Sequence, residues 1–375
     1  MIRLTIPNIS REDIQSVEMV LKSGFLVQAE KVRLFEKSIT DYTEAKYAVA
    51  VSNCTAALHL SLLVLDVKPG DLVFVTSYSW PATANVIELC GAVPIFVDID
   101  RDTFNMSPVD LADKIERLHK AGNNFNRVKA IIPVHAFGQT ADMKTIIKIA
   151  KKYYIPVLED AACALGATLN GKHAGTFGTL GCFSFHPRKA ITTGEGGIIV
   201  TNSKGLADKL RALRNHGLDP NSSSPDFIMP GFNYRMTEFQ AAFGISQMNK
   251  IRKIIAVRRK RAAYYDKLLS GTSIQFPQTI DGAEHVYQSY VILIPEKSAP
   301  KCSKIIAEMR RNNIETTIGT WYIPVTTYYK NKYGYKRDSF PVTDAVFSRA
   351  ITLPLHDKLK VSEQKCVVKK LIEQL

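Results

Sequence analysis

Short apolar runs alternate with longer segments of helical period between about residues 45 and 202. The runs that we expect to be strands lie at 47–52, 72–76, 93–98, 128–134, 156–159, 181–186 and 197–201. Several are apolar almost without interruption, which is typical of strands buried on both faces of a sheet. Helical patterns separate them at 56–65, 82–90, 141–153 and 206–215. This repetition predicts a parallel or mostly parallel sheet with helices on both sides.

The pattern changes to one long helical stretch, which we expect from 238 to 269 with a weak break near Gly244. A strand at 288–294, a helix at 301–312, a strand near 351–355 and a closing helix at 362–375 follow it. Such a succession predicts a small α/β domain tied to the first by the long helix. We therefore divide the chain into a large domain with an N-terminal arm, residues 1–245, and a small C-terminal domain, residues 246–375.

The composition of the 375 residues is that of a globular protein, with 46% hydrophobic and 22% charged residues. No apolar run is long enough to span a membrane. The N-terminal segment carries charges throughout and lacks the apolar core of a signal peptide. Six cysteines lie far apart without a CxxC pair, which indicates reduced thiols, with neither disulfides nor a metal site. We expect a cytoplasmic protein that does not contact membranes.

Most of the net charge of +14 lies in the last third of the chain. Its densest part is the cluster of Arg258, Arg259, Lys260 and Arg261. Nucleic-acid binding would require a recognisable motif or aromatic stacking platforms beside the basic residues, and neither is found. We interpret the cluster as a solvated face of a helix; the alternative is a positive field that attracts an anionic substrate.

Two segments carry polar residues where the predicted strands end. At 52–58 a polar turn leads into a helix, whose free N–H groups can hold a phosphate, with Thr55 as an added donor. Glu159 and Asp160 end a buried strand, the place where open α/β sheets bind ligands. A carboxylate there can hold a protonated heterocyclic nitrogen. Taken alone, both segments are better explained as ordinary helix caps.

A third segment, from Phe183 to Gly197, has a single lysine, Lys189, after a strand end and before a glycine-rich turn. A lysine that forms a Schiff base must be deprotonated to attack a carbonyl, and burial or nearby cations lower its pKa. We expect the neighbouring Arg188 to act in this way. The alternative for Lys189 taken alone is a surface lysine in a loop.

Together the three segments resemble pyridoxal-phosphate (PLP) aminotransferases of fold type I, in particular the DegT/DnrJ/StrS-type sugar aminotransferases. The resemblance covers nearly the whole chain, and the string from Ser184 to Gly197 is highly specific to that family. It implies an α/β fold: a large domain with a mostly parallel, mixed sheet sandwiched by helices, plus a small C-terminal α/β domain. It also implies PLP as the cofactor and pyridoxamine phosphate (PMP) as its intermediate form.

The resemblance also implies roles for single residues. Lys189 matches the Schiff-base lysine, and Asp160 matches the carboxylate that pairs with the pyridinium nitrogen. The other residues implied in cofactor binding are Trp80, stacked on the ring, Thr55, Ala56 and Ser184 around the phosphate, Cys163, and Asn233. Because Asn233 matches a residue that reaches the phosphate of the neighbouring subunit, we expect a homodimer with shared active sites.

Substrate contacts are less defined. Candidates are Phe25, His186, Arg235 and Tyr322, of which His186 and Arg235 have structural alternatives. Tyr322, Tyr328 and Tyr329 belong either to a sugar pocket or to a tyrosine-rich surface loop. The chain departs from the family at Cys54, where glycine is frequent, at Cys163, where glutamine is common, and at Ala29, where glycine is typical.

These features predict transfer of an amino group from glutamate to a keto-sugar linked to a nucleotide diphosphate, for glycan or antibiotic-type biosynthesis. Two alternatives within the family are amination of a cyclitol and PLP/PMP-dependent dehydration of a sugar. The dehydratases carry histidine in place of the lysine, so Lys189 argues against dehydration. An alternative from another class, a basic PLP-binding regulator acting on nucleic acid, would need a DNA-binding segment for which the chain has no room.

Overall fold

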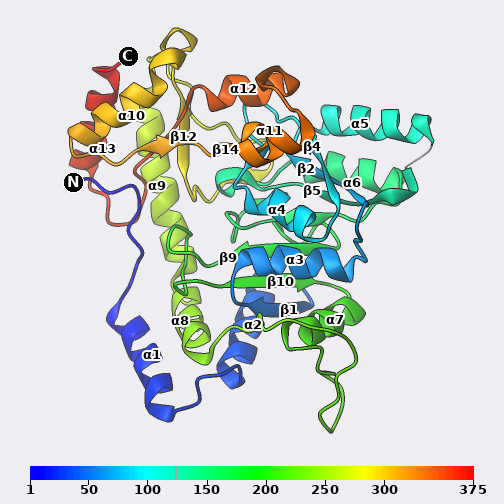
Figure 1. Cartoon of the computed structure of the whole chain (residues 1–375). Coiled ribbons are helices and arrows are strands. Elements are labelled where there is room, and N and C mark those ends of the chain that lie inside the picture. The colour runs from blue at the N-terminus through cyan, green and yellow to red at the C-terminus, as the bar shows by residue number, and fades with distance from the viewer. Residues whose placement is uncertain (123–124) are drawn as a thin grey trace.

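A central sheet runs through the large domain of the computed structural model, which describes residues 1–122 and 125–375 (Figure 1). Its strands are β1 (Tyr47–Val51), β2 (Leu72–Thr76), β4 (Val93–Val97), β5 (Val128–Ile132), β6 (Leu158–Asp160), β9 (Leu180–Ser184) and β10 (Gly197–Thr201). The order is β4-β2-β5 beside β6-β9-β10-β1, joined by parallel bridges from Ile131 to Val157 and from Val134 to Asp160. Among these strands β10 alone runs against its neighbours. The predicted mostly parallel, mixed sheet is confirmed.

Helices cover both faces of this sheet, which explains why its strands are apolar on both sides. One face packs against α3 (Cys54–Val64), α4 (Ala82–Leu89) and α7 (Lys204–Arg214). The other face packs against α2 (Glu30–Thr43), α8 (Glu238–Met248) and α9 (Ile251–Leu269). A further apolar cluster lies between the β4-β2-β5 part and the helices α5 (Pro108–Ala121) and α6 (Met143–Lys152).

The long helical stretch is two helices rather than one, and α9 reaches from the large domain into the C-terminal region (Figure 1). The break falls at Asn249 and Lys250, not near Gly244. Gly244 instead allows α8 to approach α2, because a Cβ there would lie 2.6 Å from the ring of Phe35. The C-terminal half of α9 joins a separate core built on β12 (Tyr290–Leu293) and β15 (Ala350–Leu353).

The C-terminal region is an α/β unit, and strands or bridges pair it with segments of the large domain. Strands β12, β15 and β13 (Thr317–Ile318) form its sheet, with α10 (Cys302–Arg311) and α13 (Val361–Ile372) beside it. Ile2 bridges to Ile314, so the first residues join this unit. Conversely, β14 (Trp321–Tyr322) pairs with β3 (Tyr78–Ser79) of the large domain. The division at residue 245 therefore stays a prediction.

Several elements were not expected from the sequence. These are α1 (Arg11–Ser23), α2, α5, β3, β7 (Thr168–Leu169), β8 (Lys172–His173), β11 (Ala283–Glu284), β13, β14, α11 (Thr327–Tyr333) and α12 (Pro341–Phe347). Short 3-10 turns lie at Phe125–Arg127, Ala136–Gly138, Glu296–Lys301, Ile323–Val325 and Arg337–Ser339. Within residues 1–122 and 125–375, no helix combines the length and the apolar character that crossing a bilayer requires. All six cysteines are free.

The basic cluster on α9 differs from the predicted solvated face. Arg258 is only 3% exposed and donates hydrogen bonds to the backbone carbonyls of Tyr287 (3.3 Å) and Gln288 (3.1 Å). Arg259 donates to the carbonyl of His285 and pairs with Glu284 at 2.9 Å. The expectation is wrong for Arg258, because its guanidinium satisfies carbonyls between two segments and does not face solvent.

Candidate active site

Asp160 lies at the end of β6, where the chain leaves the sheet. Its side chain is buried, and both carboxylate oxygens have donors in the protein. The N–H of Ala162 donates to Oδ1 at 3.1 Å, and the hydroxyl of Thr83, on α4, donates to Oδ2 at 2.7 Å. A carboxylate held by two donors has a fixed orientation and keeps lone pairs for another partner.

Lys189 lies in the connection between β9 and β10. The base of this connection is closed by the pairing of Ser184 with Gly197, and inside it the Lys189 N–H donates to the carbonyl of His186. The side chain is partly buried, and its Nζ donates to Sγ of Cys163 at 3.1 Å. Because Cys163 follows Asp160 by three residues, two distant segments of the chain meet at the lysine.

The pKa of Lys189 shifts in the direction opposite to the expectation. Burial lowers the pKa of its amine, but the Cys163 sulfur, followed by Cys54 and Asp160, outweighs this effect, so that the pKa is raised. Arg188 is exposed and is not among the groups with the largest effects on the pKa of Lys189. The predicted lowering by Arg188 is therefore wrong, because the lysine faces acidic groups and not a cation.

The turn between β1 and α3 exposes backbone donors next to this pair. The side chain of Asn53 caps α3 by accepting from the N–H of Ala56 at 2.8 Å. Within the described residues, the N–H groups of Cys54 and Thr55 have no acceptor in the protein. Gly197 is required beside the turn, since a Cβ there would lie 2.4 Å from the Asn53 carbonyl. The arrangement suits an oxyanion at a helix N-terminus.

The residues present fit PLP: an amine, a carboxylate with fixed orientation and a phosphate-binding helix start. Lys189, Asp160 and Cys54 interact electrostatically, so these groups share one site. The predicted phosphate donor Ala56 has its N–H occupied by Asn53, which leaves Cys54 and Thr55 as the free amides. Thr55 is exposed, and the hydroxyl of Ser184 accepts from the N–H of His186 at 3.4 Å.

Three further predicted residues are on the surface. Trp80 is 63% exposed directly after β3, and Phe25 is 75% exposed after α1. Asn233 is also exposed, and its backbone bridges to Asn215. Their exposure leaves all three side chains available to a ligand or to a second chain, and their predicted roles stay predictions.

Other candidates are occupied by contacts within the protein. His186 accepts the N–H of Arg188 through Nδ1, and Arg235 donates to Asn215 at 2.5 Å. Tyr322 lies in the core, 1% exposed, with its hydroxyl donating to the carbonyl of Arg337 at 2.9 Å. Its placement in a sugar pocket is corrected here, since neither its ring nor its hydroxyl is free. Tyr329 is buried in the same way.

The sequence did not single out two residues beside the site. The hydroxyl of Thr83 donates to Asp160. The only sequence signal for this contact was the position of Thr83 in a helix segment whose neighbouring residues are buried. Trp321, 41% exposed, pairs across the β14–β3 ladder with Ser79, whose hydroxyl contacts that of Thr83 at 3.2 Å. No local pattern could place Trp321 there, because the pairing joins residues far apart in the chain.

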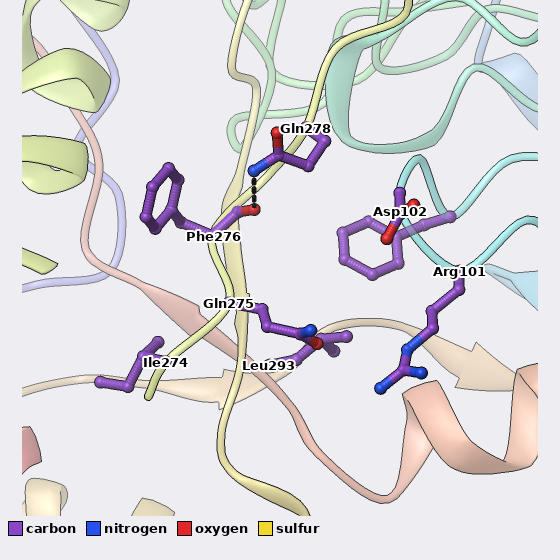
Figure 2. Close-up of a pocket in the computed structure, with 8 residues that line it drawn as sticks. Arg101, Asp102, Ile274, Gln275, Phe276, Gln278 and Leu293 are labelled. Carbon is purple, nitrogen blue, oxygen red and sulfur yellow. Dashed lines mark hydrogen bonds between the residues drawn. The ribbon is translucent and has the colours of Figure 1, made fainter. Parts of the chain in front are cut away.

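A cavity of about 370 Å³ lies elsewhere, between the loop that contains Arg101 and Asp102 and the segment from Ile274 to Gln278 (Figure 2). None of the cofactor-site residues lines it. Gln278 and Phe276 contribute from one side and the Arg101–Asp102 loop from the other. Arg101 is paired at 3.0 Å with Glu296, whose carboxylate also pairs with Arg349 at 3.1 Å.

Comparisons with known proteins agree with this geometry. The model of the DegT/DnrJ/EryC1/StrS aminotransferase family matches residues 7–372. GDP-perosamine synthase of Caulobacter vibrioides is 40% identical over 284 residues, which cover 75% of this chain and 74% of that protein. The PMP form of a putative sugar aminotransferase from Streptococcus pneumoniae gives a TM-score of 0.92 at 27% identity, covering 100% of this chain and 99% of that one. PseC of Helicobacter pylori, an aminotransferase involved in pseudoaminic acid biosynthesis, gives 0.91 at 26% identity, covering 100% and 98%.

The fold and the site define a PLP-dependent aminotransferase of fold type I. The chain belongs to the DegT/DnrJ/EryC1/StrS aminotransferase family, and within it to the enzymes that aminate sugars.

Proposed function

We propose that the enzyme transfers an amino group from glutamate to the keto group of a sugar linked to a nucleotide diphosphate, for glycan or antibiotic-type biosynthesis. The observation that carries this is the meeting of Lys189, Cys163 and Asp160 beside the free amides of α3, in a chain 40% identical to GDP-perosamine synthase. The basic C-terminal third supports an anionic substrate. Free cysteines support a cytoplasmic location.

The roles of the protein groups follow from their contacts. Bound PLP supplies an aldehyde and an electron-accepting ring. Asp160, held by Thr83 and Ala162, presents a fixed carboxylate that keeps a ring nitrogen protonated. Lys189 has to lose a proton from Nζ before it attacks a carbonyl, and the Cys163 sulfur, 3.1 Å from Nζ, holds the amine in place. With PLP and a substrate bound, Nζ would be the protein group that moves a proton at the reacting carbon.

We further propose that a second copy of the chain completes the site. Apolar side chains of α1 and the segment after it are exposed: Ile14 (61%), Met19 (66%), Phe25 (75%) and Val27 (66%). Several large apolar side chains exposed on one segment of a monomer are typical of an interface. A dimer is also what the predicted role of Asn233 across subunits requires.

The test is incubation with glutamate and a panel of UDP-, GDP- and dTDP-linked 3-keto and 4-keto sugars, with the product mass as the readout. We expect one or a few sugars to gain an amino group, and Lys189→Ala to lose both this product and the absorbance of lysine-bound cofactor. Retention of that absorbance without amination of any nucleotide sugar would refute the substrate class. Sedimentation of the wild type and of Phe25→Ser tests the dimer, which we expect the substitution to weaken.

A further inference from the structure

A second cavity, of about 290 Å³, lies on the face of the large domain that carries α2 and α9. Its wall is formed by α2, the hairpin of β7 and β8, the first turns of α9, and β11. None of the residues of the cofactor site lines it. The polar residues around it are Tyr42, Thr168, His173, Arg252, Arg259 and Glu284.

Arg252 and Arg259 line this cavity together with one carboxylate, Glu284, and the carboxylate of Glu44 acts electrostatically on His173 from outside the lining. Glu284 is engaged by Arg259, whose guanidinium also donates to the carbonyl of His285. Arg252 is exposed and has no ion pair among the residues that the structure describes, although it acts electrostatically on both Tyr42 and His173. One guanidinium at the cavity is therefore free to pair with an anion.

Hydroxyl donors accompany the free guanidinium. In the described part of the chain, neither Tyr42 nor Thr168 has a side-chain hydrogen bond. The ring of Tyr42 lies against that of His173, with centroids 5.3 Å apart, which fixes where its hydroxyl lies. A guanidinium together with hydroxyl and imidazole groups offers the donors that the oxygens of a phosphate accept.

A glycine allows the wall of this cavity to pack closely. Gly166 has a φ of +89°, and a Cβ there would lie 2.4 Å from Cδ1 of Ile255 and 2.7 Å from the Tyr42 hydroxyl. A glycine at this position thus lets the hydroxyl and the helix approach the backbone closely. The wall of the cavity depends on a residue without a side chain.

We propose that this cavity is a second anion site, separate from the cofactor site, that binds the phosphate group of a small molecule through Arg252, Tyr42 and Thr168. The site does not depend on the proposed function. Its volume exceeds what a bare phosphate needs, so a phosphate ester such as a nucleotide is accommodated as readily as the free ion.

Isothermal titration of the PLP-loaded protein with inorganic phosphate tests this, with uridine monophosphate in a parallel arm. The loaded protein is used because its cofactor already fills the phosphate site at α3. We expect Arg252→Gln to raise the dissociation constant by about tenfold or more, since it removes a charge-assisted contact. Lys253→Gln, which removes the neighbouring exposed cation of the same helix, is the matched control and leaves binding unchanged. Tighter binding of the nucleotide than of phosphate identifies an ester as the ligand; equal binding identifies the free ion.

Three results overturn the proposal: no binding to the wild type, equal losses in the two variants, or unchanged affinity in Arg252→Gln. Equal losses would indicate attraction by overall charge alone, and unchanged affinity would place the phosphate elsewhere, in the active site for example. The absorbance of lysine-bound cofactor, recorded for each variant, shows that the active site is intact. A failure here is thereby distinguished from a failure of the proposed aminotransferase function.

Discussion

Thr83 offers the sharpest test of how Asp160 is held. Replacement by valine keeps the volume and branching of the side chain but removes the hydroxyl that donates to Oδ2 at 2.7 Å. Thr83 is 1% exposed and Asp160 4% exposed, so water cannot easily replace the lost donor. After the substitution the carboxylate keeps only the N–H of Ala162.

The size of the effect follows from the charge of the acceptor. A hydrogen bond to a charged group contributes about 1.5–3 kcal/mol, more than a neutral one. We therefore expect Thr83→Val to lower the free energy of unfolding of the cofactor-free protein by about 1.5–3 kcal/mol. A carboxylate that is free to turn also binds a ring nitrogen less well, and we expect the dissociation constant of PLP to rise by about tenfold, or about 1.4 kcal/mol.

Urea unfolding gives the first quantity, and titration followed by the absorbance of lysine-bound PLP gives the second. Thr83→Ser restores the hydroxyl and should recover most of both losses. Ser79→Ala removes a hydroxyl that contacts Thr83 at 3.2 Å but not Asp160, and should change PLP binding less. Wild-type stability together with wild-type PLP affinity in Thr83→Val would show that the hydroxyl does not position the carboxylate.

Two further substitutions test the fold. Glu238→Gln should lower the free energy of unfolding by about 1–3 kcal/mol, because the buried carboxylate accepts from the N–H groups of Ala29, Lys31 and Val32 at the start of α2 and an amide has one acceptor oxygen fewer; the exposed Glu30→Gln is the control, and equal effects in urea unfolding would contradict the argument. Burial lowers the pKa of His285 from 6.5 to about 3, so the unfolded chain binds a proton that the folded protein excludes. The wild type should therefore be most stable above pH 6.5 and lose up to about 1.4 kcal/mol per pH unit through this group as the pH falls toward 3; His285→Asn should show a shallower loss in urea unfolding, and identical slopes would rule the mechanism out.

The parts of the fold that the sequence predicted are those with strong local patterns. β2 and β10 have the predicted bounds, since unbroken apolar runs between polar turns mark strands buried on both faces. Helix α5 was not predicted, although Leu111 and Ile115, its buried residues, stand at helical spacing. The antiparallel direction of β10 could not be predicted from local sequence either. It depends on the path of the connection between β9 and β10, which contains Lys189.

In the candidate site too, the residues that lie in specific local strings were predicted, and those placed by contacts between distant segments were not. Lys189 and Asp160 stand in specific strings, and the structure brings them into electrostatic contact. Tyr322 was misplaced because an aromatic residue in a polar stretch is equally compatible with surface and core. Thr83 and Trp321 depend on pairings between distant segments, which no spacing within one segment reveals.

The connection from 185 to 196 has its two ends paired to each other, as Ser184 faces Gly197 across adjacent strands. A slip of one residue in that ladder would turn each side chain to the opposite face of the sheet. For enzyme engineering, this means that the whole loop can be exchanged between relatives as long as the two flanking strands keep their register. A single insertion within the loop would instead move the Lys189 amine away from Cys163 and Asp160.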